Sequence, residues 1–108
     1  MIKHQSVQER RNSYGIYLVA LDSKKAPIGC MMITFQINPT LGGVVYAIHH
    51  DYVKENYRNL GVHKRLFEKC VKLAKADKLC KGIKLLIESS NKSAQEVAES
   101  YGMKRKDG

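Results

Sequence analysis

Residues 52–72 read YVKENYRNLGVHKRLFEKCVK, and this stretch decides the fold because it joins a loop to a helix. Apolar side chains recur in its second half at the spacing of one helical face, with lysine, arginine and glutamate between them, which predicts an amphipathic helix. The apolar positions are Leu66, Phe67, Cys70, Val71 and, just beyond the stretch, Ala74. The first half contains Asn56, Asn59 and Gly61 and is typical of a loop. We therefore expect a strand that enters a helix through a glycine-containing turn.

The start of this helix is a candidate anion site. The first amide hydrogens of a helix have no partner within the helix, and the backbone dipole places partial positive charge there. An anion can bind such a terminus without any side chain. The side chains that add donors around this point are Arg58, His63, Lys64 and Arg65.

Apolar runs on both sides of this unit predict a sheet. Tyr14 to Leu21, Ile28 to Ile37 and Val44 to Val53 read as strands joined by short links, which favours an antiparallel meander. Ile83 to Ser89 reads as a buried strand, and the helical crossover before it returns the chain parallel to the strand ahead of the loop. We expect an α+β fold, an αβ sandwich with a mixed, mainly antiparallel sheet and helices packed on it.

The two ends of the chain are less regular. Residues 1–12 are polar and predict a frayed tail or a short helix. Ser93 with Glu96 fits the capping box of a last helix, and Gly102 fits the position after its end. The length of 108 residues predicts a single domain over residues 1–108.

Composition narrows the class of protein. The net charge of +9 favours a polyanionic partner, such as a phosphorylated cofactor, nucleic acid or an acidic surface, or else a solvated lysine-rich face. Cys30, Cys70 and Cys80 are odd in number and lack a CxxC spacing, so we expect reduced thiols and neither a disulfide framework nor a metal site. No apolar run approaches membrane-spanning length and no signal peptide is visible, which predicts a cytoplasmic protein that does not enter a membrane.

Two motifs carry a family resemblance. Residues 58–63, Arg-Asn-Leu-Gly-Val-His, resemble the pyrophosphate loop of the GNAT superfamily of acetyl-CoA-dependent N-acetyltransferases, which reads Arg or Gln, two residues, Gly, one residue, then Gly or Ala. His63 departs from the pattern at its last position, where a small residue normally lets the phosphates approach. Residues 91–103 resemble the family's closing motif, Asn-x-x-Ala, a helix, and Gly followed by Phe or Met. The resemblance covers roughly residues 44–103.

The resemblance implies acetyl-CoA as the co-substrate and an amine as the acceptor. The cofactor-binding residues it implies are Tyr52, Val53, Arg58, Asn59, Leu60, Gly61, Val62, His63, Lys64 and Asn91. It also implies that the strands before the loop and after the helix splay apart to admit the pantetheine arm. Family domains usually carry acceptor-binding elements before the meander and a further strand pair after the closing motif. Here about a dozen residues precede the first predicted strand and five follow Met103, which predicts a compact form, short at both ends.

Acetyl transfer needs a base for the amine, and the resemblance places this base on the strand before the loop. Several relatives have a glutamate at the position of Ala47, and the arylalkylamine acetyltransferases have histidines at the positions of Ala47 and His49. His49 is therefore the first catalytic candidate, and strand alternation predicts that Asp51 shares its face and orients it. His50 becomes the candidate if a bulge turns it to the cleft. In the alternative, both histidines merely fill a half-buried strand.

The resemblance is less complete at the residue that would protonate the leaving thiolate. The family commonly has a tyrosine at the position of Ala98, and Tyr101 lies one helical turn later.

The function predicted is acetyl transfer from acetyl-CoA to an amine, and the alternative is a degenerate CoA-binding module without catalysis. A nucleic-acid-binding module is disfavoured, because the lysine-rich helix has one aromatic, Phe67, on its apolar face. The expected acceptor is an amine of a small molecule or of a protein, and a homodimer is compatible with the sequence.

Overall fold

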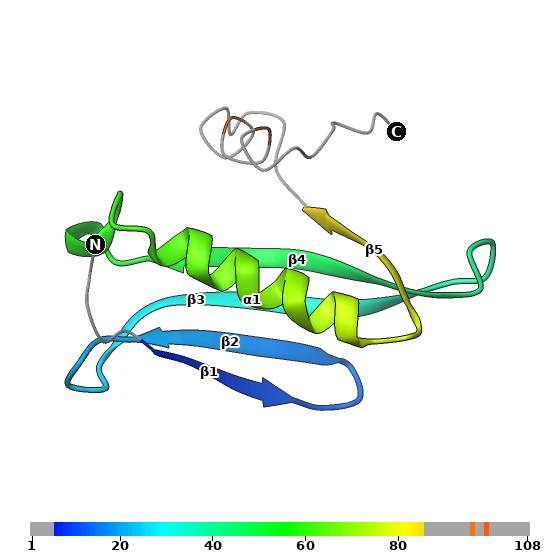
Figure 1. The fold of residues 1–108 in the computed structure, drawn as a ribbon, viewed down its shortest axis with the longest axis horizontal. Coiled ribbons are helices and arrows are strands. Elements are labelled where there is room, and N and C mark those ends of the chain that lie inside the picture. The colour runs from blue at the N-terminus through cyan, green and yellow to red at the C-terminus, as the bar shows by residue number, and fades with distance from the viewer. Residues whose placement is uncertain (1–5, 86–95, 97–98, 100–108) are drawn as a thin grey trace.

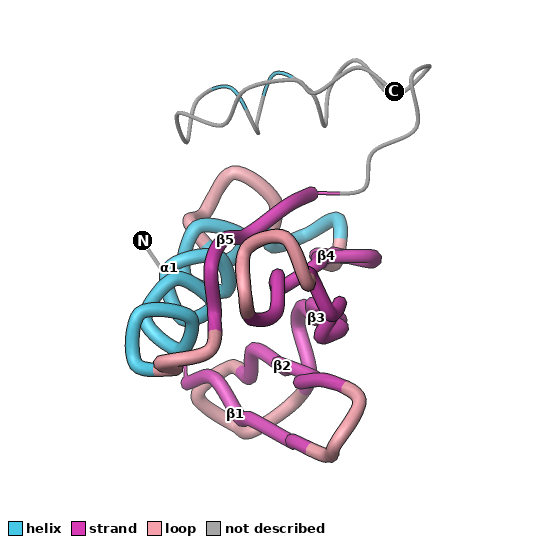
Figure 2. Tube along the Cα trace, turned by 90° about the vertical axis from the view of Figure 1, so that its right-hand side faces the viewer, coloured by secondary structure: helices cyan, strands magenta, loops and turns pink. Residues whose placement is uncertain are grey.

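The computed structural model describes residues 6–85, 96 and 99 of the chain. The elements are β1 (Ser6–Arg11), β2 (Gly15–Leu21), β3 (Pro27–Asn38), β4 (Gly43–Val53), the short 3-10 helix η1 (Glu55–Tyr57), α1 (Val62–Ala76) and β5 (Cys80–Leu85). The strands form one sheet in the order β1-β2-β3-β4-β5, antiparallel from β1 to β4 and parallel between β4 and β5. Figures 1 and 2 show α1 lying across one face of this sheet. The predicted α+β fold with a mixed, mainly antiparallel sheet is confirmed.

The first strand was not expected. The prediction of a frayed tail or short helix is wrong for Ser6–Arg11, which pair along their whole length with β2. Val7 is the one half-buried side chain of β1, and the others are exposed. An edge strand with one apolar contact is held mainly by its ladder of backbone hydrogen bonds, so its sequence carries no alternating pattern.

The end of the described chain differs from expectation only in its boundary. β5 begins at Cys80, three residues before the predicted start at Ile83. Within the predicted last helix the structure describes Glu96 and Glu99, and both are helical. The predicted cap residues Asn91 and Ser93 lie outside the described residues. No described helix has the length and apolar character needed to cross a membrane.

The core lies between α1 and the sheet. Its fully buried large side chains are Ile16, Leu18, Ile28, Met31, Ile33, Tyr46, Ile48, Val62, Leu66 and Cys70. The helix approaches β3 closely at Gly29, where an added Cβ would lie 3.0 Å from Val62 Cγ1 and 3.5 Å from Leu66 Cδ1. Burial raises the pKa of the Cys70 thiol to about 12, so we expect this cysteine to be inert, and all three cysteines are free, as predicted.

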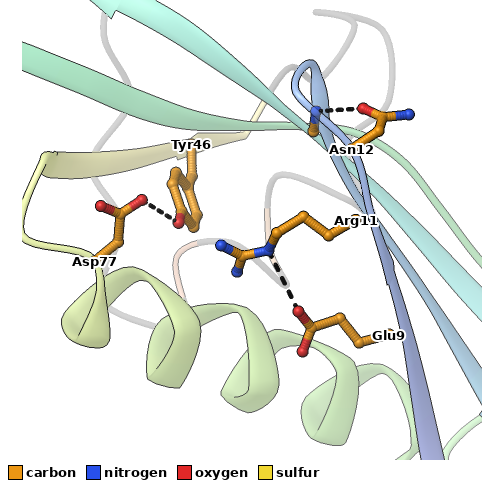
Figure 3. A network of polar contacts seen from close by, with 6 residues as sticks. Glu9, Arg11, Asn12, Tyr46 and Asp77 are labelled. Atoms are coloured by element: carbon orange, nitrogen blue, oxygen red, sulfur yellow. Dashed lines mark hydrogen bonds and ion pairs between the residues drawn. The ribbon is translucent and has the colours of Figure 1, made fainter.

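A buried tyrosine ties the end of α1 to the sheet (Figure 3). Tyr46 on β4 is fully buried, and its hydroxyl donates to Asp77 Oδ2 at 2.6 Å. Asp77 directly follows α1, and its Oδ1 accepts the Leu79 amide at 2.9 Å. Burial raises the pKa of the Tyr46 phenol, while the hydrogen bond from Tyr46 lowers the pKa of Asp77. The same view shows Arg11 Nε paired with Glu9 Oε2 at 3.3 Å on β1.

We expect Tyr46→Phe to lower the free energy of unfolding by about 1–2 kcal/mol near pH 7, because a hydrogen bond to a carboxylate is lost. The pKa of Asp77 is lower in the folded state than in the unfolded state. Its contribution is therefore present above the unfolded pKa of roughly 4 and is lost as pH falls through the folded value. Urea unfolding at pH 7 and pH 3 should show the two proteins converging in acid.

The matched control is Tyr14→Phe, because Tyr14 is 80% exposed. This variant should unfold like the unmodified protein at both pH values. A difference between Tyr46→Phe and the unmodified protein that stays constant with pH would contradict the role given to Asp77.

Candidate functional site

The loop between β4 and α1 is held by its own backbone and by Arg58. The Lys54 amide donates to Ile28 O at 2.9 Å, and η1 follows directly. Arg58 Nε donates to Val53 O at 3.0 Å, and the guanidinium carbon lies 5.9 Å from the centre of the Tyr52 ring. Arg58 thus folds back over the end of β4.

The turn into α1 needs a left-handed residue. Gly61 is the N-cap with φ 84°, and a Cβ there would meet no atom within 4 Å, so conformation and not space requires glycine. The first hydrogen bond within the helix runs from the Arg65 amide to Gly61 O at 3.0 Å. No side chain caps the helix start. The amides of the first turn therefore have no side-chain cap, an arrangement in which a helix start can bind an anion.

β4 contains a bulge at His49. Ile48 pairs with Ile33 and His50 pairs with Met32, so His49 is the extra residue between two adjacent pairs. Beyond it, Asp51 pairs with Met31, which is buried beneath α1. The expectation that Asp51 shares the face of His49 is therefore wrong. The extra residue of the bulge moves the side chains that follow it to the opposite face of the sheet.

Asp51 consequently contacts α1 instead of His49. Its Oδ2 is hydrogen bonded to His63 Nε2, in the first turn of the helix. The imidazole of His63 is thus held toward β4 by a carboxylate. The Asp51 side chain is 36% exposed and that of His63 is 26% exposed, so solvent screens the pair in part.

His49 lies on the face of the sheet opposite α1. Its Nε2 is 2.5 Å from Thr34 Oγ1 of β3, and the ring is half-buried. The tautomer sets the direction of this bond: either Thr34 donates to Nε2, or Nε2–H donates to Thr34 and leaves Nδ1 as the basic atom. Sequence reasoning missed Thr34, because only the pairing of β3 with β4 brings it to His49. The structure describes the backbone of His50 and not its side chain.

The remaining predicted cofactor residues lie around the helix start. Leu60 and Lys64 line a groove along α1, whereas the Val62 side chain is buried in the core, so only its backbone faces the turn. Asn59 adopts a left-handed φ of 64°. Asn91 lies outside the described residues.

A basic groove continues from the turn along α1. It has a volume of about 580 Å³ and is lined by Val7, Leu60, Gly61, Lys64, Arg65, Glu68, Lys69 and Lys72. Four of these side chains are cationic and one is anionic, so the groove carries a positive field that favours an extended anion. The sequence placed these lysines on the polar face of the helix but did not show that they border a groove.

A family model described as the acetyltransferase (GNAT) family matches residues 2–103. Solved structures with the same fold include a possible acetyltransferase from Clostridium difficile 630, with 24% identity and a TM-score of 0.81 over 91% of this chain and 64% of that one. A transcriptional regulator from Bacillus halodurans C-125 has 20% identity and a TM-score of 0.80, over 91% of this chain and 65% of that one. Among curated proteins, no match was found.

One further structure aligns over nearly its whole length. AAC(6')-Iy in complex with a bisubstrate analogue, CoA-S-monomethyl-acetylneamine, has 13% identity and a TM-score of 0.83, over 98% of this chain and 95% of that one. At these identities the likeness establishes the fold. The chain spans slightly less than two thirds of the length of the first structures it matches, 64% and 65%.

Proposed function

The chain belongs to the GNAT acetyltransferase family, and from this membership we propose that it binds acetyl-CoA and transfers the acetyl group to an amine. One observation carries the proposal: the uncapped first turn of α1 opens into a basic groove. Helix-terminal amides suit the pyrophosphate, and the cations beside them suit the remaining phosphate of the nucleotide. In this assignment Gly61 to Lys64 provide the amides, and Arg58, Lys64 and Arg65 provide charge.

Solved relatives support the choice of cofactor. AAC(6')-Iy has been crystallised with CoA and with a bisubstrate analogue that contains CoA. The groove in this chain has the charge that such a ligand requires, since four cationic side chains border it.

We assign the base to His49. The half-buried ring of His49 lies on β4, the strand on which the family resemblance places the base, and it is hydrogen bonded to Thr34. The lone pair of the amine attacks the thioester carbonyl carbon, His49 takes the amine proton, and the C–S bond breaks. The thiolate leaves and is protonated by water.

A second candidate is a CoA-binding module without catalysis. It is favoured by Ala98, which stands where the family commonly has the tyrosine that protonates the thiolate. Turnover separates the two candidates, because the module would bind acetyl-CoA and acetylate no amine.

Calorimetry with acetyl-CoA tests the binding step. We expect acetyl-CoA to bind more tightly than acetyl-pantetheine, and its affinity to fall with salt, because the phosphates provide the contacts. Arg58→Ala should weaken acetyl-CoA binding by about 1–3 kcal/mol, because a charged donor is lost.

The matched control for Arg58→Ala is Lys24→Ala. It removes one positive charge from the exposed turn between β2 and β3 and should leave the affinity unchanged. Equal binding of acetyl-CoA and acetyl-pantetheine, or binding of neither, would remove the proposed cofactor site.

A further inference from the structure

The face of the sheet opposite α1 exposes a group of apolar side chains within residues 6–85. Tyr17 is 40% exposed, Met32 is 37% exposed and Tyr52 is 54% exposed. Tyr17 pairs with Met32 across β2 and β3, and Cys30 pairs with Tyr52 across β3 and β4, so these side chains share one face. Their strand neighbours, such as Leu18 and Met31, are buried beneath α1 on the other face. We call Tyr17, Val19, Cys30, Met32 and Tyr52 the open-face patch.

The open-face patch borders the proposed base. Met32 and Thr34 are alternate residues of β3 and therefore lie on the same face. Thr34 is hydrogen bonded to His49 at 2.5 Å. An amine whose proton is taken by His49 must therefore place the rest of its molecule on or beside this patch.

The charges on this face are positive. Arg10 pairs with Tyr17, and Lys84 pairs with Ala47, the residue that faces Thr34 across β3 and β4.

Strand carboxylates are missing from this face in the part of the chain that the structure describes. Glu9 pairs with Leu18, and Asp51 pairs with Met31, so both lie on the α1 side. Without the bulge at His49, Asp51 would share the face of His49. The bulge therefore removes from the open face an acid that regular alternation would have put beside the base.

These charges bear on which amines can bind. A polyamine or an aminoglycoside carries further ammonium groups. These groups would lose water here, meet cations and find no carboxylate on the strands that the structure describes. An aromatic or aliphatic body would instead bury apolar surface against the tyrosines and Met32, a favourable exchange. Nearby positive charge also favours the neutral form of the single reactive amine.

We propose that the acceptor is a monoamine with an apolar or aromatic body, and that the open-face patch selects it against polycationic amines. This inference rests on the proposed acetyl transfer and adds the class of acceptor. It separates this chain from AAC(6')-Iy, whose bound analogue contains the aminoglycoside neamine.

The test compares phenylethylamine, spermidine and neamine as acceptors, with release of the CoA thiol as the readout. We expect kcat/KM to be at least about tenfold higher for phenylethylamine than for either polycation. Apolar contacts in a binding pocket typically distinguish substrates by a factor of this size. Met32→Glu puts a carboxylate on the patch and should shift the ratio toward spermidine by about tenfold, whereas Met32→Gln, of similar size and neutral, should shift it far less.

The control for added charge is Ile37→Glu, at an 82% exposed position near the end of β3 on the α1 side, and it should leave the ratio unchanged. Equal or faster acetylation of spermidine or neamine would overturn the acceptor class and leave acetyl transfer standing. Acetyl-CoA binding without acetylation of any of the three amines or of a wider amine panel would overturn the transfer itself, and the inference with it.

Discussion

Replacement of His49 by glutamine is expected to lower kcat for acetyl transfer about a hundredfold or more, the usual contribution of a positioned general base. Glutamine keeps the size and hydrogen-bonding capacity of the side chain but cannot take up the proton. Affinity for acetyl-CoA should stay unchanged, because His49 is not among the proposed phosphate contacts. The rise of the rate with pH that a histidine base produces should also flatten in the variant.

Two further variants make this result specific. Thr34→Val removes the hydrogen bond to His49 Nε2 and should lower kcat with little change in KM. Thr34→Ser keeps the hydroxyl and should retain kcat, as expected of a positioning residue. His50→Gln, at the adjacent position, should keep the full rate. If His49→Gln retains the rate and its pH dependence while His50→Gln loses them, the base is His50. If both variants retain the rate and its pH dependence, histidine base catalysis is wrong.

Leu66→Ala is expected to lower the free energy of unfolding by about 2–5 kcal/mol, the range for a leucine removed from a packed core. Leu66 has no exposed surface and packs against Gly29 of β3. The loss is large because β3 is a central strand that cannot move in to fill the cavity. Urea unfolding measures it, with Leu79→Ala, 62% exposed, as a control that should change stability by less than about 0.5 kcal/mol.

Acetyl-CoA should stabilise both leucine variants to a similar extent if each still folds to the same binding site. Saturation at a hundred times Kd adds about 2.7 kcal/mol when the ligand binds only the folded state. A Leu66→Ala protein as stable as the unmodified one would show that α1 is not packed on the sheet as described.

The amino-acid sequence by itself determined the parts of the fold that depend on neighbouring residues. The helical spacing of Leu66, Phe67, Cys70, Val71 and Ala74 predicted the buried face of α1. Four of these side chains are buried, and Val71 is half-buried against the core. Gly61 and the polar residues before it predicted the turn, because a helix start is set by local backbone chemistry. The parallel pairing of β4 with β5 followed from the crossover, which has few physical solutions.

Only the tertiary structure decided what depends on register between distant strands. β1 has one apolar contact and is a strand because β2 offers it backbone partners. The bulge at His49 sends Asp51 to His63 and leaves His49 with Thr34, fifteen residues away in the chain. A bulge leaves no mark in the order of side chains along its own strand. It arises from the fit of β4 against β3, and that fit is an interaction between segments that the periodicity of either segment alone does not contain.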